Sequence, residues 1–203
     1  VTAVKHCNNV DVWVITHLWN SSSFHAFLLT AAGINSLPVI SNVGSLHTGS
    51  SNFMGYLKAS SNGSKLACAI RYMNIFEIFD FNNNTGVVSN ALTSPATFNF
   101  PYGVEFSPDA TKLYVSCGVG GTNQIWQFDL LGGTSTAIFG SATLIGTPVG
   151  PSMGALQLGP NGKIYAAKYY QNYLGVINNP NALGTASNYV DNVTDDRRNS
   201  SII

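Results

Sequence analysis

The chain has 203 residues, of which 45% are hydrophobic and 9% are charged, and its Lys and Arg residues equal its Asp and Glu residues in number. This length allows one compact array with a substantial core and leaves no room for a second domain of useful size. A neutral, sparsely charged surface lacks the clustered positive charge that binds nucleic acid or anionic membranes, so we expect neither partner. The apolar runs are too short to span a bilayer, so we expect no membrane insertion.

One turn motif recurs along the chain. Its turn residue is Asn62, Asp109 or Asn161, with a weaker first copy at Asn8, and in the last three copies a Lys and an apolar run follow shortly afterwards. Such a turn is typical of a hairpin that enters a strand. Copies about 50 residues apart, without a helical apolar stripe, are typical of propeller blades.

The first two units, residues 1–50 and 51–99, each divide into four predicted strands. In the first unit they are Thr2–His6, Asp11–His17, His25–Thr30 and Val39–Val43. In the second unit they are Tyr56–Ser60, Lys65–Tyr72, Ile75–Phe81 and Val87–Leu92. The second strands are apolar at successive positions, which predicts that other parts of the protein cover both of their faces.

The last two units, residues 100–150 and 151–193, follow the same plan. The third unit has predicted strands at Gly103–Ser107, Lys112–Cys117, Gln124–Leu130 and Ala137–Leu144. The fourth has them at Ala155–Leu158, Lys163–Tyr169, Tyr173–Ile177 and Ala186–Val190, and residues 194–203 form a tail outside the pattern. We therefore predict an all-β fold, a β-propeller-type array of about four antiparallel four-stranded blades. No spare strand is left to close a ring, so we expect the array to be part of a larger propeller or assembly.

Several segments resemble a known class of propeller. They are Thr2–Asn8, Asp11–His17, Pro38–Gly44, Gly55–Ser60, Phe79–Asn82, Tyr102–Pro108 and Gly154–Pro160. They resemble the WD-repeat-like propeller region of secreted, Flavobacteria-type surface proteins of Bacteroidota, which commonly carry gliding-motility-associated or type IX secretion sorting domains at their C-termini. The resemblance implies a secreted, cell-surface protein. Such propellers usually have more than four blades, and the chain starts at Val1 without a leader, so we expect a mature or excised segment.

Three polar residues occupy equivalent positions in the predicted first strands. Lys58, Glu105 and Gln157 each precede the turn residue of their unit by the same interval. First strands line the central channel of a propeller, so we expect these side chains to converge on its axis. There they either bind a ligand or pair with one another.

Histidines supply the only metal candidates. His17 and His25 flank a predicted hairpin loop, and a cross-strand pair is half of a zinc site, with His47 as the possible third ligand. The alternative is a histidine pair without metal. We expect that alternative, and no cofactor.

Other positions point to structure or to export. We expect Asp80, Asp129 and Asn178, near the ends of third strands, to bond the backbone of the next turn. Cys68 and Cys117 lie in apolar strands, which predicts buried thiols that act as small hydrophobic groups. Sequons that could carry glycans in an extracellular protein begin at Asn20, Asn62, Asn83, Asn192 and Asn199.

No catalytic motif stands out, and the two glutamates, Glu77 and Glu105, lie in different units. We therefore expect a non-enzymatic extracellular scaffold or adhesion module. Its blade loops and edges would bind a protein partner, a glycan or copies of itself as a homo-oligomer or fibrous assembly. The alternative is a propeller enzyme, a lyase or hydrolase, with its site at the channel mouth around Lys58 and Glu105.

Overall fold

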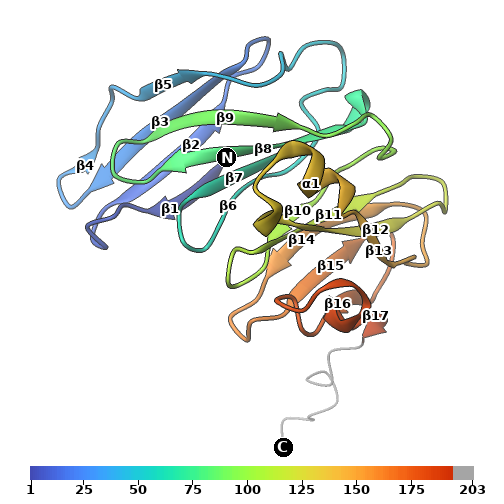
Figure 1. Ribbon diagram of the computed structural model, residues 1–203. Coiled ribbons are helices and arrows are strands. Elements are labelled where there is room, and N and C mark those ends of the chain that lie inside the picture. Colours follow the sequence, from blue (N-terminus) through green and yellow to red (C-terminus); the bar gives the residue numbers. More distant parts are fainter. Residues whose placement is uncertain (194–203) are drawn as a thin grey trace, which may run out of the picture.

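Four antiparallel sheets follow one another in chain order in the computed structural model, which describes residues 1–193 (Figure 1). Each sheet is one blade, and successive blades pack face to face with their first strands on the inside of the array. The predicted all-β propeller with four blades is confirmed. The predicted tail, residues 194–203, lies outside the described residues.

Blades 1 and 2 agree closely with the predicted strands. Blade 1 consists of β1 (Thr2–Lys5), β2 (Val12–His17), β3 (Ser23–Thr30), β4 (Gly33–Ile34) and β5 (Val39–Asn42). Blade 2 consists of β6 (Leu57–Ala59), β7 (Lys65–Ile70), the 3-10 turn η1 (Arg71–Met73), β8 (Ile75–Asn82) and β9 (Val87–Thr93). The short strand β4 was not predicted, and it pairs with the end of β3 while β5 pairs with the start of β3.

Blades 3 and 4 contain short helical segments that were not predicted. Within residues 1–193, the other such segment is η1 of blade 2. Blade 3 consists of β10 (Val104–Phe106), β11 (Lys112–Cys117), β12 (Gln124–Asp129), the 3-10 turn η2 (Leu130–Gly132), α1 (Ser135–Gly140) and β13 (Thr143–Gly146). Blade 4 consists of β14 (Met153–Leu158), β15 (Ile164–Lys168), β16 (Leu174–Ile177), the 3-10 turn η3 (Gly184–Ser187) and β17 (Tyr189–Val193).

The strand predicted at Ala137–Leu144 is wrong over its first half, which belongs to α1, and β13 starts only at Thr143. Thr134 caps the helix: its hydroxyl oxygen accepts a hydrogen bond from the Ala137 amide at 3.2 Å. Ile138 is buried in the core between blades 2 and 3, and Phe139 packs against the same core. The strand predicted at Ala186–Val190 likewise begins as η3, and β17 starts only at Tyr189.

The repeated turn folds the same way in every blade. The side-chain oxygen of Asn8, Asn62, Asp109 or Asn161 accepts a hydrogen bond from the amide two residues further along. The residue after each turn residue has a positive φ: Asn9, Gly63, Ala110 and Gly162. Glycine and asparagine tolerate that conformation at low cost, which explains their recurrence there. The weak first copy at Asn8 is therefore a true member of the repeat.

Successive strand residues face different cores. Leu66 and Cys68 of β7 pack toward blade 1, whereas Ala67 and Ala69 pack toward blade 3. Because every second side chain of a strand points to the same face, each inner blade contributes to two cores. The predicted cover on both faces is confirmed for β7, and β11 is buried along its whole length.

The two end blades each keep one open face. Figure 1 shows blades 1 and 4 at opposite ends of the array, and within residues 1–193 no hydrogen bond or ion pair joins them. Leu29 and Ile40, on the outer side of blade 1, are 40% and 56% exposed. On blade 4, Leu174 and Val190 are 43% and 41% exposed. On the outer side of β2, Val12 and Val14 are only partly buried, so the cover predicted for both faces of this strand is incomplete there.

Candidate functional site

Lys58, Glu105 and Gln157 converge at the centre of the array. They lie on β6, β10 and β14, which are the first strands of blades 2, 3 and 4. The Lys58 Nζ atom lies 3.0 Å from Glu105 Oε2 and donates a hydrogen bond to Gln157 Oε1 at 2.6 Å. The structure thus brings together the three residues that the sequence placed at equivalent positions.

Backbone groups hold this cluster in place. Glu105 accepts hydrogen bonds from the amides of Phe106 and Leu158, at 3.1 and 3.0 Å, and Gln157 donates to the Leu158 carbonyl oxygen at 3.0 Å. Lys58 and Glu105 side chains are 15% and 6% exposed. The polar groups of Lys58, Glu105 and Gln157 mostly bind one another or the backbone, and so connect blades 2, 3 and 4. The predicted ligand-binding role of the three residues stays a prediction.

Asp80, Asp129 and Asn178 hold their blades together in a way that the sequence did not reveal. Each accepts a hydrogen bond from the lysine of the neighbouring strand, namely Lys65, Lys112 and Lys163. Partial burial acts to raise the pKa of Asp80, but hydrogen bonds from Asn90 and Lys65 outweigh it and leave that pKa below its usual value. The expected bond to the next turn occurs at Asp129, which accepts from the Leu131 amide.

A cavity of about 740 Å³ opens among the loops of blades 2, 3 and 4, and we call it the arginine cavity. It is within the size range of small-molecule sites. Its walls are largely apolar and aromatic, and they include Met54, Arg71, Tyr72, Tyr102, Val119, Met153 and Tyr169. The cavity lies beside the segments that lead into the first strands of blades 2, 3 and 4.

Arg71 is the unusual group in the arginine cavity. It is only 9% exposed, and its guanidinium carbon lies 5.6 Å from the centre of the Phe100 ring and 5.4 Å from that of Tyr102. No carboxylate within residues 1–193 forms an ion pair with it. Buried charges usually have an ionic partner, and a guanidinium fork matches a carboxylate or phosphate.

Sequence reasoning missed Arg71, although one signal was available. It is the only arginine before residue 197, and it directly follows an apolar strand. By contrast, Lys168 in the same cavity wall is fully paired, because its Nζ donates to Asp191 at 2.7 Å and also to Asn192. Arg71 is therefore the cation of this cavity that is available to a ligand.

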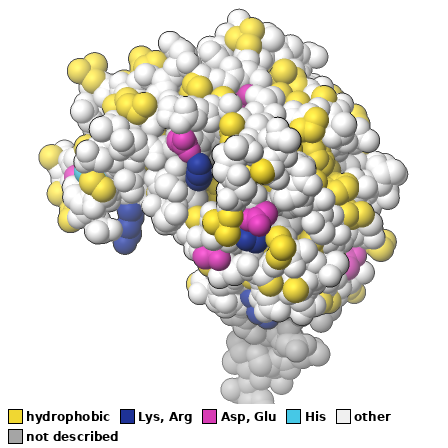
Figure 2. All heavy atoms as spheres, in the orientation of Figure 1, with side chains coloured by type: hydrophobic (Ala, Val, Ile, Leu, Met, Phe, Trp, Pro, Cys, Tyr) yellow, Lys and Arg dark blue, Asp and Glu magenta, His cyan; other side chains and the backbone are white. Residues whose placement is uncertain are grey.

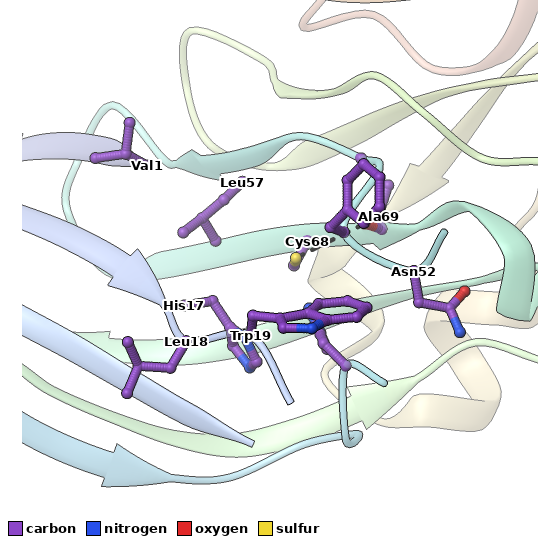
Figure 3. Close-up of a pocket in the computed structure, with 11 residues that line it drawn as sticks. Val1, His17, Leu18, Trp19, Asn52, Leu57, Cys68 and Ala69 are labelled. Atoms are coloured by element: carbon purple, nitrogen blue, oxygen red, sulfur yellow. Dashed lines mark hydrogen bonds between the residues drawn. The ribbon is translucent and has the colours of Figure 1, made fainter. Parts of the chain in front are cut away.

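A smaller cavity of about 150 Å³ lies between blades 1 and 2, and we call it the histidine cavity. Figure 3 shows His17 and Trp19 of blade 1 on one side, with Leu57 and Cys68 of blade 2 on the other. His47, which also lines the cavity, stacks on His17 with ring centres 3.7 Å apart.

The predicted pair of His17 and His25 is wrong. The hairpin pairs His17 with Phe24 and Thr16 with His25, so the two histidines project from opposite faces of blade 1. A one-residue difference in register reverses the face of a side chain. His47, named as a third ligand, is instead the partner of His17. Within residues 1–193 no group of three His, Cys, Asp or Glu side chains is arranged to hold a metal.

Burial keeps the groups of the histidine cavity neutral. It lowers the pKa of His17 to about 4, assisted by the charge of His47, and it lowers the pKa of His47 to about 4. Burial also raises the pKa of the Cys68 thiol to about 12. Cys68 and Cys117 are buried as predicted, and a thiol with so high a pKa is a poor nucleophile.

The predicted glycosylation positions have different surroundings. Asn20 and Asn62 lie in exposed turns, and Asn83 lies in the loop between β8 and β9. Asn192 lies in β17 and accepts a hydrogen bond from Lys168, while Asn199 lies outside the described residues. Glycosylation at these positions stays a prediction. In the described part of the chain, helices are all too short to cross a membrane.

Three solved structures show similarity in fold. A streptogramin B lyase matches with a TM-score of 0.55 and 17% identity over 96% of this chain and 55% of its own. A periplasmic gluconolactonase from Pseudomonas aeruginosa matches with a TM-score of 0.56 and 12% identity over 86% of this chain and 52% of its own. The β-propeller domain of Cps50 from Myceliophteria thermophila matches with a TM-score of 0.52 and 11% identity over 87% of this chain and 50% of its own.

These comparisons establish the propeller fold, and the chain spans about half the length of the structures that it matches. No protein-family model and no curated protein matches the sequence. The resemblance to Bacteroidota surface proteins therefore stays a prediction.

The expectation of a non-enzymatic scaffold or adhesion module needs correction. Of the three similar structures, two are enzymes by name, a lyase and a gluconolactonase. They favour the alternative that the sequence left open, a propeller enzyme, over the scaffold. Shared architecture at this level of identity does not carry over a substrate, so the reaction has to be argued from the cavities of this chain.

Proposed function

We propose that this protein is a propeller hydrolase or lyase that binds a small anionic substrate in the arginine cavity. The observation that carries the proposal is the buried Arg71 guanidinium, which faces a cavity of ligand size without an acidic partner in the described residues. A carboxylate or phosphate would supply the missing countercharge.

The surroundings of Arg71 favour recognition by a fixed group. The rings of Phe100 and Tyr102 restrict the guanidinium plane, and Tyr72 packs edge-on against Phe100 with ring centres 5.6 Å apart. A cation held between rings loses little freedom when it binds an anion. The apolar remainder of the cavity would then accept the uncharged part of the substrate.

The same cavity provides hydroxyl groups for a ring-opening or elimination step. Tyr72, Tyr102 and Tyr169 line it, and a hydrogen bond with Tyr170 raises the pKa of Tyr169. A protonated phenol can donate a hydrogen bond to an oxygen that becomes negatively charged as an ester or lactone bond breaks. We assign substrate holding to Arg71 and charge stabilisation to the tyrosines. Lys58 and Glu105 then act as positioning residues, because their pairing fixes the first strands beneath the cavity.

The substrates to test follow from the similar solved structures, which include a lyase and a gluconolactonase, and from the positive charge of Arg71. Lactones and cyclic esters that carry a phosphate or carboxylate should be turned over faster than neutral ones with the same ring. Arg71→Met should lower kcat/KM for the anionic compound about 10- to 100-fold, the loss expected for a charge-assisted hydrogen bond. It should change kcat/KM for the neutral compound far less.

A matched control is Lys5→Met, which removes an exposed positive charge from blade 1, far from the cavity. It should leave both substrates unaffected. Absence of turnover with every anionic lactone and cyclic ester would refute the enzyme assignment. Equal losses for anionic and neutral substrates in Arg71→Met would refute the role of Arg71.

We also propose that the protein is exported. The sequons and the resemblance to secreted proteins support this location, and one protein that shares the fold is named as periplasmic. Fractionation of the native host tests it: recovery from the cytoplasm alone would refute the proposal, and glycan mass on Asn20, Asn62 or Asn83 would support an extracellular location.

A further inference from the structure

The arginine cavity combines one positive charge with walls that a ligand meets mainly as apolar surface. Val119 is 42% exposed, Tyr72 is 51% exposed and Tyr169 is 58% exposed, so a bound molecule can reach these three side chains. Met54, which is half-buried, adds a flexible apolar side chain to the same wall. Exposed apolar side chains that gather around a hollow are typical of a ligand site.

The charge of the cavity can also be reached. Arg71 makes no side-chain hydrogen bond within residues 1–193, and none of its guanidinium nitrogens is completely closed off from solvent. Its backbone amide donates to the Met54 carbonyl oxygen at 3.1 Å, which fixes the start of η1 against the cavity wall. The guanidinium donors are therefore free to bind an anion inside the cavity.

Few other polar side chains of the wall are free. Lys168 is paired with Asp191 and Asn192. The Ser152 hydroxyl donates to the Gly118 carbonyl oxygen at 3.5 Å. Apart from Arg71, the tyrosine hydroxyls are what remains, whereas a polyhydroxylated ring such as a sugar needs a partner for nearly every hydroxyl that it buries. The wall therefore suits a molecule with one anionic group and an apolar remainder.

Two aromatic residues beside the cavity have a costly backbone conformation. Phe100 and Tyr170 both have a φ of 51°, and within residues 1–193 no other aromatic residue has a positive φ. Bulky side chains rarely adopt this conformation, and residues that do so cluster at ligand sites. The Phe100 ring lies against Arg71, and the ring centres of Tyr169 and Tyr170 are 4.2 Å apart. The strained residues thus hold aromatic rings at two places on the cavity margin.

From these observations we propose that the substrate of the arginine cavity is an aryl-substituted anion. It is a lactone or cyclic ester that carries both a carboxylate or phosphate and an aromatic ring. This inference rests on the proposed function, because it takes Arg71 as the group that holds the anion. The ring would pack among Val119, Tyr72 and Tyr169, since tyrosine and methionine side chains make favourable contacts with aromatic rings.

Calorimetric titration with four small probes tests which parts of the substrate are recognised. 3-Phenylpropionate carries the anion and the ring, propionate carries the anion alone, and 3-phenylpropionamide carries the ring alone. The first should bind saturably to the intact chain and about 10-fold more tightly than either of the others, because only it uses both the charge and the apolar wall. Glucuronate, an anion with a polyhydroxylated ring, should bind no more tightly than propionate.

Val119→Ser removes apolar surface from the wall and leaves Arg71 in place. It should lower the affinity for 3-phenylpropionate about 3- to 5-fold and leave the affinity for propionate unchanged. Val149→Ser is the matched control, because Val149 is an exposed valine of the loop before β14 that does not line the cavity. It should change neither affinity. Met54→Ser is an independent variant with the same expected result as Val119→Ser.

The inference is overturned if 3-phenylpropionate fails to bind saturably, or if any of the other three probes binds as tightly. It is also overturned if neither Val119→Ser nor Met54→Ser weakens the binding of 3-phenylpropionate. Equal binding of propionate and 3-phenylpropionate would remove the preference for a ring but leave the anion site of the proposed function in place. Conversely, the expected binding by a protein that turns over no anionic lactone or cyclic ester would refute the proposed reaction and support the recognition of aryl anions.

Discussion

The stacked rings of His17 and His47 make the stability of the protein depend on pH. Their pKa values are lowered to about 4, whereas imidazoles in an unfolded chain titrate near 6.5. Between these values the unfolded state binds more protons than the folded state, so stability falls as the pH falls. We expect the Tm measured by calorimetry to be constant near pH 7 and to decrease from about pH 6.5 toward pH 4.

Replacement of both histidines by Phe should flatten this dependence while the stack remains. The single variant His25→Phe should retain it. Carboxylates such as Asp80 and Asp191, whose pKa values are lowered, affect stability mainly below about pH 4, so they do not mimic the histidines in this window. An unchanged pH dependence in the double variant would show that other groups are responsible.

Individual site residues could be predicted only where the repeat fixed their register. Lys58, Glu105 and Gln157 were placed correctly because each lies at a set interval before a turn with one geometry. The pairing of His17 with His25 was wrong because a hairpin loop can shift the register by one residue without a mark in the sequence. Arg71 was missed because its ring partners, Phe100 and Tyr102, come from another loop of the fold.

At the scale of elements, the packing of blade 3 against blade 4 depends on the close approach of their first strands. Gly103 lies just before β10, and a Cβ atom there would come within 2.7 Å of the Gly154 carbonyl oxygen and the Leu156 nitrogen. Backbone atoms cannot move aside as a flexible side chain can. Gly103→Ala should therefore lower the free energy of unfolding by about 1–3 kcal/mol, measured by urea denaturation.

Gly140→Ala is the matched control for this change. A Cβ atom at Gly140 would meet nothing within 4 Å, so this variant should remain within about 0.5 kcal/mol of the original protein. If Gly103→Ala is equally stable, the two strands must adjust more freely than their present separation indicates.

Strands were predictable because turn chemistry and alternation of side chains repeat in each unit. The helix α1 was not predicted, since Ile138 and Phe139 read equally well as part of a short strand. Long-range packing favours the helix. The ring centres of Phe139 and of Phe76 in blade 2 are 5.6 Å apart, and Ile138 is buried in the same core. A short apolar run does not reveal such a distant partner.

At the scale of the whole molecule, the array presents an exposed apolar face at each end. Within the chain, the face that one blade turns toward the next is always covered by the complementary face of that neighbour. Within residues 1–193, only the outer face of blade 1 and the outer face of blade 4 are not covered by a neighbouring blade. On the side of the molecule shown in Figure 2, the charged residues are few and scattered.

Expressed by itself, this 203-residue chain should therefore pair into dimers, with blade 4 of each copy covering blade 1 of the other in a closed two-fold arrangement. Sedimentation velocity should show a dimer that Leu29→Thr with Ile40→Thr weakens about 10-fold or more, because two exposed apolar side chains leave the interface. Leu174→Thr with Val190→Thr should have a similar effect from the opposite face. Leu37→Thr, an equally apolar change at an exposed loop position, should have little effect. A monomer at all concentrations would contradict this pairing. If substitutions on only one of the two faces weaken the dimer, blade 4 does not cover blade 1 in a closed two-fold arrangement.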